Sequence, residues 1–250
     1  MGTFFDVPLD GGKIRCVLYC ADPAAVRHAV LFCHGFGGHR ENRAAARYAA
    51  HELAGRKDFA LVTFDWPCHG SDAHETLRLE DCTRYLRRMT EYITERFEPE
   101  TLDAYATSFG GYLTLKYISE HGSPFRRIAL RAPAVNMHDA LIGTILPPDD
   151  CQRLLAGEVV EAGFDRKIPV TRAFVESLRQ ADIRQRDFTP WADRILILHG
   201  TCDEIISPAA VTAFAEKNGI TLIPFQGGDH RFLNPGQMDA AIERIAEFLR

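Results

Sequence analysis

Residues 102–115, LDAYATSFGGYLTL, decide the fold of this chain. A run of small and apolar residues, typical of a buried strand, passes through a tight turn at Ser108 into a stretch with helical character. A serine on such a turn adopts strained backbone angles at a cost of roughly 1 to 3 kcal/mol, and the residues two positions before and after it must be small. Ala106 and Gly110 meet that requirement. We therefore expect the Ser108 hydroxyl at a helix N-terminus, where the dipole favours negative charge, although Ser108 alone could be a simple helix cap.

The same alternation of strand and helix runs along most of the chain. Short β-rich runs predict strands at residues 14–19, 29–33, 60–64, 102–106, 127–131, 195–199 and 221–225. Longer stretches predict helices at residues 43–54, 79–97, 110–120, 208–218 and 235–249. Parallel strands joined by crossover helices are covered by helices on both faces. The sequence therefore predicts an α/β fold with a mostly parallel, twisted sheet of about seven to eight strands.

The alternation lapses between residues 133 and 190, where glycine and proline breaks surround two short predicted helices. This stretch is too short for a well-cored independent domain, and the alternation resumes unchanged after it. We expect residues 1–132 and 191–250 to form one domain, with residues 133–190 as an inserted cap, or lid, subdomain.

Charge and composition argue against several classes of partner. The formal net charge of −5 gives no electrostatic footprint for nucleic acid or an anionic membrane, both of which require clustered Lys and Arg. No apolar run approaches the roughly 18 residues of a membrane span. The first residues carry no secretion signal, and seven scattered cysteines, an odd number, suit a reducing compartment. We expect a cytoplasmic protein whose oligomeric state is open, a homodimer included.

No cofactor and no metal are expected. A glycine-rich segment, residues 34–38 (HGFGG), follows a predicted strand, but Arg40 stands where a dinucleotide-binding motif needs its third glycine. No phosphate-binding GK[ST] sequence follows either. The only cluster of possible metal ligands does not have the spacing of a zinc site; it comprises Cys68, His69, His74 and Cys82.

The HGFGG segment suits acyl transfer better. That reaction develops an oxyanion, which needs two N–H donors, one beside the nucleophile and one from a loop after an earlier strand. The backbone N–H groups of Phe109 and Phe36 are the candidates. Gly35 and Gly37 would let the loop backbone approach a substrate closely. An ordinary glycine-rich turn is the alternative interpretation.

Two further polar residues follow the last two predicted strands. Asp203 lies in HGTCDEIISP and His230 in FQGGDHRF. A serine needs a neutral imidazole to take its proton and a carboxylate to orient that imidazole, and these residues fit those roles. All these segments lie at the carboxyl ends of predicted strands, where open parallel sheets bind ligands, and the order is Ser, acid, His. Alone, Asp203 could be a helix cap and His230 a turn residue.

In this combination of motifs the sequence resembles the α/β-hydrolase superfamily over nearly its whole length. The resemblance implies Ser108 as nucleophile, Asp203 as the acid, His230 as general base and then acid, and the N–H groups of Phe36 and Phe109 as the oxyanion hole. It also implies that the first predicted strand, residues 14–19, pairs antiparallel with its neighbour. Ala106 replaces the first glycine of the usual GxSxG motif, and a small residue is kept.

Residues 131–141, RAPAVNMHDAL, and the small cap resemble the cinnamoyl (feruloyl) esterases and related small carboxylesterases. This resemblance implies that Asp139 accepts a hydrogen bond from a substrate hydroxyl; a solvated aspartate is the alternative. Phe164 and Phe174 could line an acyl or aryl pocket, although packing of the cap would explain them as well. The cap is too charged for a greasy lipase lid, which favours small, soluble esters.

Three functions therefore compete. A serine carboxylesterase leads, because the three expected catalytic residues are in order beside the glycine-rich loop. A serine peptidase or an acyl-thioesterase could use the same residues, but no cluster suited to a substrate amine or carboxylate is evident. The third is a binding protein that kept the fold without hydrolysis, which would usually show a lost catalytic residue.

Overall fold

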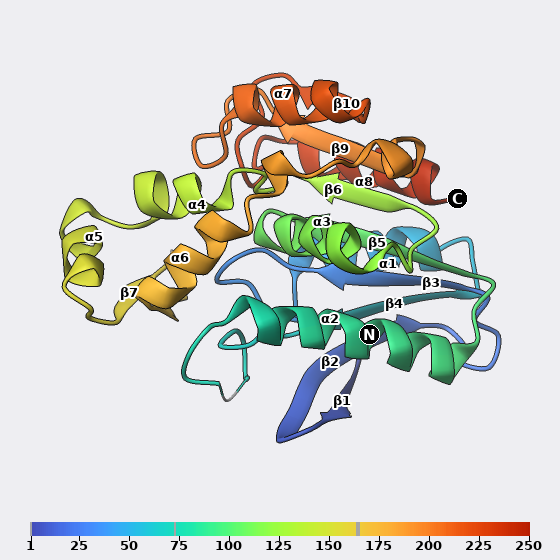
Figure 1. Cartoon of the computed structure of the whole chain (residues 1–250). Helices are drawn as coiled ribbons and strands as arrows, with labels where there is room; N and C mark the ends of the chain where they lie inside the picture. The colour runs from blue at the N-terminus through green and yellow to red at the C-terminus, as the bar shows by residue number, and fades with distance from the viewer. Residues whose placement is uncertain (1, 73, 164–165) are drawn as a thin grey trace.

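A computed structural model describes residues 2–72, 74–163 and 166–250. One sheet runs in the order β1-β2-β4-β3-β5-β6-β9-β10 (Figure 1). Every strand pair from β4 to β10 is parallel. The eight strands are β1 (Thr3–Leu9), β2 (Gly12–Cys20), β3 (His28–Cys33), β4 (Phe59–Phe64), β5 (Thr101–Thr107), β6 (Ile128–Arg131), β9 (Ile195–Gly200) and β10 (Thr221–Phe225). The predicted α/β fold and its mostly parallel sheet are confirmed.

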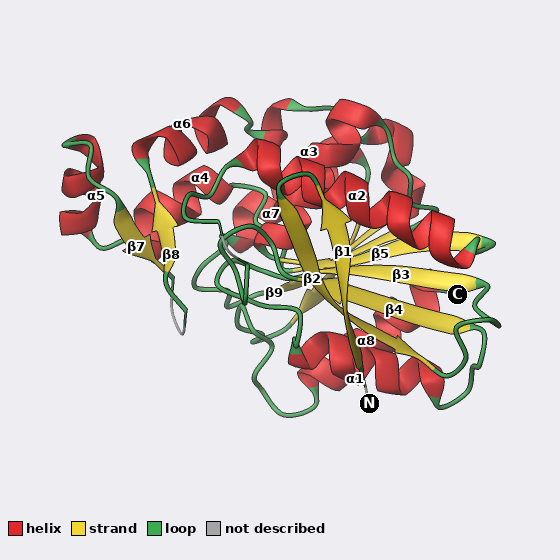
Figure 2. Ribbon diagram, turned by 90° about the horizontal axis from the view of Figure 1, so that it is seen from below, coloured by secondary structure: helices red, strands yellow, loops and turns green. Residues whose placement is uncertain are grey.

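Helices cover both faces of the sheet (Figure 2). One face carries α2 (Leu79–Phe97), α3 (Phe109–His121) and α7 (Pro208–Asn218), and the other carries α1 (Arg43–Leu53) and α8 (Gln237–Leu249). Helix α7 begins at Pro208, as the predicted range 208–218 has it, and a proline at the first helical position loses no hydrogen bond. Pro235 instead lies before α8, so the predicted start of that helix was two residues early.

The sheet has one edge that sequence patterns did not reveal. Strand β1 was not predicted, and it pairs antiparallel with β2 along seven residues. Strand β2 in turn pairs antiparallel with β4, which confirms the antiparallel first pair implied by the family resemblance. Pro8 is tolerated in β1 because an edge strand leaves some N–H positions unpaired.

The segment from residue 133 to 190 adds no strand to the large sheet within its described residues. It forms α4 (Met137–Ala140), a π-helical turn (Leu141–Ile145), α5 (Pro148–Leu155), a hairpin of β7 (Val160–Ala162) and β8 (Ile168–Val170), α6 (Arg172–Gln180) and a 3-10 turn (Ile183–Gln185). A second 3-10 turn (Thr189–Arg194) leads into β9. Two short helices were expected here; the described residues of the segment hold three α-helices, and the hairpin is a further addition.

This inserted segment shares its apolar core with the sheet domain. Its buried side chains, among them Leu154, Phe174 and Leu178, join the same cluster as the α2 and α3 side of the sheet. Figure 1 shows α5 at the far end of the segment, away from the sheet. Within the described residues, every helix is too short or too polar to cross a lipid bilayer.

Candidate active site

Ser108 lies in the turn between β5 and α3 with φ 50° and ψ −118°, a backbone conformation that residues other than glycine rarely adopt. Its N–H donates to the Arg131 carbonyl on the neighbouring strand over 3.1 Å. Position 110 must hold a glycine, because a Cβ atom there would lie 2.2 Å from the Cys33 carbonyl oxygen. The strained turn predicted from residues 102–115 is therefore present.

Three side chains from three loops form one hydrogen-bonded chain. The Ser108 Oγ lies 3.0 Å from His230 Nε2, and His230 Nδ1 lies 2.8 Å from Asp203 Oδ2. A carboxylate only accepts hydrogen bonds, so Nδ1 carries the imidazole proton and Nε2 is free to accept from the Ser108 hydroxyl. The structure thus brings together the three residues that the sequence singled out after strands β5, β9 and β10.

Asp203 is held as an ionised carboxylate. Burial by itself raises the pKa of its carboxyl group, but the hydrogen bond from His230 and those from the N–H groups of Ile206 and Ile205 outweigh burial and leave the pKa below its ordinary value. Those N–H groups lie 2.8 and 2.9 Å from Oδ1. The buried His199 imidazole lies 3.4 Å from Oδ2 and was not singled out from the sequence.

The glycine-rich loop lies directly against Ser108. A Cβ atom on Gly35 would stand 3.1 Å from the Ser108 Cβ, so glycine permits this approach. The Gly35 carbonyl accepts hydrogen bonds from the Gly38 N–H (2.9 Å) and from His34 Nδ1 (2.8 Å). A trans peptide directs its N–H opposite to its C=O, so the Phe36 N–H points away from those two donors.

Phe109 is the first residue of α3, where helix geometry leaves an N–H without an intrahelical partner. No residue in the described part of the chain accepts a hydrogen bond from the Phe36 or Phe109 N–H. The two phenyl rings meet edge to face, with centroids 5.6 Å apart. Both N–H groups named from the sequence therefore lie on segments that contact or flank Ser108.

Two buried histidines lie at this loop, His34 within it and His69 against it. The Trp66 N–H donates to His34 Nε2 over 3.3 Å, which assigns the imidazole proton of His34 to Nδ1. His69 packs against the rings of Phe36 and Phe109. Burial lowers the pKa of His69 to about 4, so its imidazole is neutral at pH 7. Among the described residues, no three His, Cys, Asp or Glu side chains form a group that could hold a metal ion.

Of the three residues suggested as substrate contacts, Asp139 and Phe174 lie in different surroundings. Asp139 forms an ion pair with Arg184 at 2.8 Å and contacts His138, so its carboxylate has partners within the inserted segment. Phe174 is buried and packs edge-on against Phe109, with centroids 6.3 Å apart. Phe164 lies outside the described residues. Substrate roles for these three residues remain predictions.

The fold and the arrangement of Ser108, His230 and Asp203 define the class of protein. The chain belongs to the alpha/beta hydrolase family, whose sequence model matches residues 30–247. This membership supports a hydrolase. No curated protein matches the chain significantly by sequence.

Several solved structures share the fold at low sequence identity. Est1E from Butyrivibrio proteoclasticus, in complex with ferulic acid, has a TM-score of 0.78 and 17% identity, with 98% of this chain and 99% of that chain covered. A monoacylglycerol lipase from Paleococcus ferrophilus has a TM-score of 0.71 and 17% identity, covering 95% and 98%. An α/β serine hydrolase without a lid, from Xanthomonas campestris, has a TM-score of 0.66 and 17% identity, covering 100% and 94%.

Proposed function

We propose that this protein is a serine carboxylesterase that cleaves small, soluble carboxylic esters through an acyl-enzyme on Ser108. The observation that carries this proposal is the hydrogen-bonded chain from Ser108 through His230 to Asp203. It ends beside a glycine-rich loop and a helix N-terminus that can supply N–H donors.

The chemistry follows from this geometry. His230 Nε2 takes the Ser108 proton as Oγ attacks the ester carbonyl, and Asp203 stabilises the imidazolium that forms. The N–H groups of Phe36 and Phe109 receive the developing oxyanion. His230 then protonates the leaving alcohol. A water molecule repeats the sequence on the acyl-enzyme, which releases the acid and restores Ser108.

Features of the inserted segment favour a small ester as the substrate. We treat residues 133–190 as the cap over the site, separate from a catalytic domain of residues 1–132 and 191–250. Exposed acidic residues on this segment, such as Asp149 and Glu158, alternate with the exposed apolar Leu155 and Val159, so its surface is mixed rather than uniformly apolar like a lid for lipid substrates. The similarity to Est1E, whose structure holds ferulic acid, makes aryl esters a reasonable first set of substrates.

A cytoplasmic location also belongs to this proposal. All seven cysteines are free thiols, and Cys16, Cys33 and Cys82 are buried in the core. Such thiols suit a reducing compartment.

The decisive experiment replaces the nucleophile. Ser108→Ala should lower kcat on p-nitrophenyl butyrate by at least about 10³-fold, since the remaining groups give only residual catalysis. Ser119→Ala is a matched control in helix α3, the helix that follows Ser108. The Ser119 hydroxyl donates a hydrogen bond to the Lys116 carbonyl within that helix. Undiminished turnover by the Ser108→Ala protein would refute the assignment.

Parallel assays separate the alternatives. A peptidase would cleave aminoacyl amides, which a carboxylesterase leaves intact, and a thioesterase would prefer acyl-thioesters. A non-catalytic binding protein would fail to react with a fluorophosphonate probe at Ser108. Rates on methyl ferulate and on esters of increasing acyl length would then define the substrate.

A further inference from the structure

Arg131, the last residue of β6, contacts both Ser108 and the loop that carries His230. Strand β6 lies between β5 and β9, the strands that lead to Ser108 and Asp203. The backbone carbonyl of Arg131 accepts the Ser108 N–H over 3.1 Å. Its guanidinium Nη1 donates to the His230 carbonyl, also over 3.1 Å. One residue therefore links the nucleophile and the histidine through its main chain and its side chain.

Burial of the Arg131 guanidinium costs free energy because the group is charged. Arg131 is 9% exposed, and no carboxylate of the described residues forms an ion pair with it. A cation in this position must be stabilised by other groups. The group lies over the Phe232 ring, 5.4 Å from its centroid, which adds a cation–π contact on the same loop. Its charge also opposes the rise that burial causes in the pKa of the neighbouring Tyr105.

The main chain of His230 has weak support apart from Arg131. Its N–H lies 3.4 Å from the exposed Glu204 carboxylate. The Arg231 and Leu233 N–H groups donate to Asp229 within the loop. Earlier in the loop, the Gly228 carbonyl accepts from the Cys202 N–H and the Gly227 N–H donates to the Thr201 hydroxyl, but neither bond involves the main chain of His230. The guanidinium contact therefore ties the His230 backbone directly to the central sheet.

We propose that Arg131 is a positioning residue that fixes the main chain of His230 relative to Ser108 and thereby sets the distance between Nε2 and Oγ. This inference rests on the proposed serine hydrolase. A charge-assisted hydrogen bond is stronger than a neutral one, so it holds the carbonyl in one place. Small displacements of catalytic groups lower the chemical rate far more than they weaken substrate binding.

The test compares two variants of Arg131 on p-nitrophenyl butyrate. We expect Arg131→Met to lower kcat about 10- to 100-fold while KM changes less than about 3-fold, because only the geometry of the reacting groups is lost. Arg131→Lys should lose about 3- to 10-fold, since an ammonium keeps one charged donor but not the planar fork. The low-field proton resonance of His230 Nδ1 should weaken in the same order, and so should the rate of labelling by a fluorophosphonate.

Arg127→Met is a closely matched control. Arg127 also donates to a backbone carbonyl, that of Phe248 at 2.6 Å, and lies over that residue's ring at 5.5 Å. It lies at the opposite end of β6 from Ser108. We expect this variant to lose stability but to keep the wild-type kcat.

Three results would overturn the inference. These are an Arg131→Met protein with wild-type kcat, an equal loss of kcat in Arg127→Met, and an unchanged low-field resonance despite a lower kcat. If Arg131→Met fails to fold, Arg131→Lys decides by the same criteria. Failure of the proposed function is distinct, because it would appear as turnover by the wild type that does not depend on Ser108.

Discussion

Gly110 controls how closely α3 approaches β3. A Cβ atom on Gly110 would lie 2.2 Å from the Cys33 carbonyl oxygen and 2.6 Å from the His34 carbonyl oxygen. Both neighbours are backbone atoms and cannot rotate away as a flexible side chain would. The left-handed φ of Ser108 persists because this contact, together with the Ser108 N–H bond to β6, holds the turn in place.

Gly110→Ala should therefore impair both stability and catalysis. We expect a loss of at least about 3 kcal/mol in the free energy of unfolding, at the upper end of what overpacking costs, because the helix must move away from the strand. Ester hydrolysis should fall at least about 10-fold with it. Urea denaturation and p-nitrophenyl butyrate assays measure the two effects. Gly143→Ala is the control, since its added Cβ would meet open space; equal behaviour of the two variants would contradict this prediction.

The sequence could predict those residues of the candidate site that directly follow a strand. Ser108, Asp203 and His230 each follow a parallel strand, so topology alone brings them to one edge of the sheet. Arg131 has no such signal, because a single arginine at the end of an apolar strand usually points to solvent. The pairing of Asp139 with Arg184 depends on how the inserted segment folds, which local patterns do not encode.

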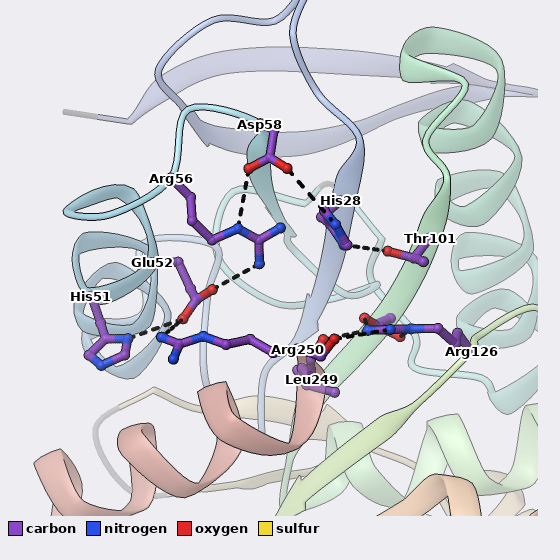
Figure 3. A network of polar contacts seen from close by, with 10 residues as sticks. His28, His51, Glu52, Arg56, Asp58, Thr101, Arg126, Leu249 and Arg250 are labelled. Atoms are coloured by element: carbon purple, nitrogen blue, oxygen red, sulfur yellow. Dashed lines mark hydrogen bonds and ion pairs between the residues drawn. The ribbon is translucent and has the colours of Figure 1, made fainter.

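The end of helix α8 is held by two arginines that precede β6. Arg126 donates to the Leu249 carbonyl and to the Arg250 carbonyl, and Arg127 donates to Phe248. Cations at the C-terminus of a helix satisfy free carbonyl groups and complement the helix dipole. Figure 3 shows Arg126 at Leu249 and the Arg250 side chain reaching Glu52 near the end of α1. Helices α8 and α1 are thus joined to the sheet at the edge remote from Ser108.

Arg126→Ala tests this attachment. Arg126 also pairs with Asp103, a carboxylate that is buried in β5, through contacts of 2.6 and 3.0 Å. Removing one partner of a buried pair leaves an uncompensated charge, so we expect a loss of about 3 kcal/mol in the free energy of unfolding. Arg244→Ala, which breaks an exposed pair with Glu247, should change it by less than about 0.5 kcal/mol. A similar small change in both variants would show that the Arg126 pair contributes little.

Sequence patterns missed very short strands and one strand at the edge of the sheet. Strands β7 and β8 have three residues each, too few to establish an alternating pattern. Strand β1 contains Pro8 and exposed Phe4, which obscure its strand character, and its pairing with β2 is a tertiary contact. Longer helices were predicted to the residue in α2 and α7. Helix α2 has an apolar stripe that extends over several turns, and Pro208 marks the start of α7.

The molecule as a whole keeps several histidines neutral. Burial lowers the pKa of five of them, namely His28, His34, His39, His69 and His199. His34 is the first residue of the glycine-rich segment, His69 packs against it, and His199 contacts Asp203. Protonation of these histidines in acid therefore affects the fold in the region that positions the candidate site.

The protein should accordingly lose stability in mild acid. A histidine whose pKa is lower in the folded state stabilises the fold fully above its unfolded pKa of about 6.5, and this contribution disappears as the pH falls toward the folded value. For His69, with a folded pKa of about 4, the loss between pH 7.5 and pH 5 is about 2 kcal/mol, and His34 adds in the same direction. Carboxyl groups with lowered pKa values, such as Asp203, titrate below this window.

Urea denaturation at the two pH values measures the change. His69→Gln should reduce the difference by about 2 kcal/mol because the side chain no longer titrates; equal stability of the wild type at pH 7.5 and pH 5 would contradict the neutral, buried state of these histidines.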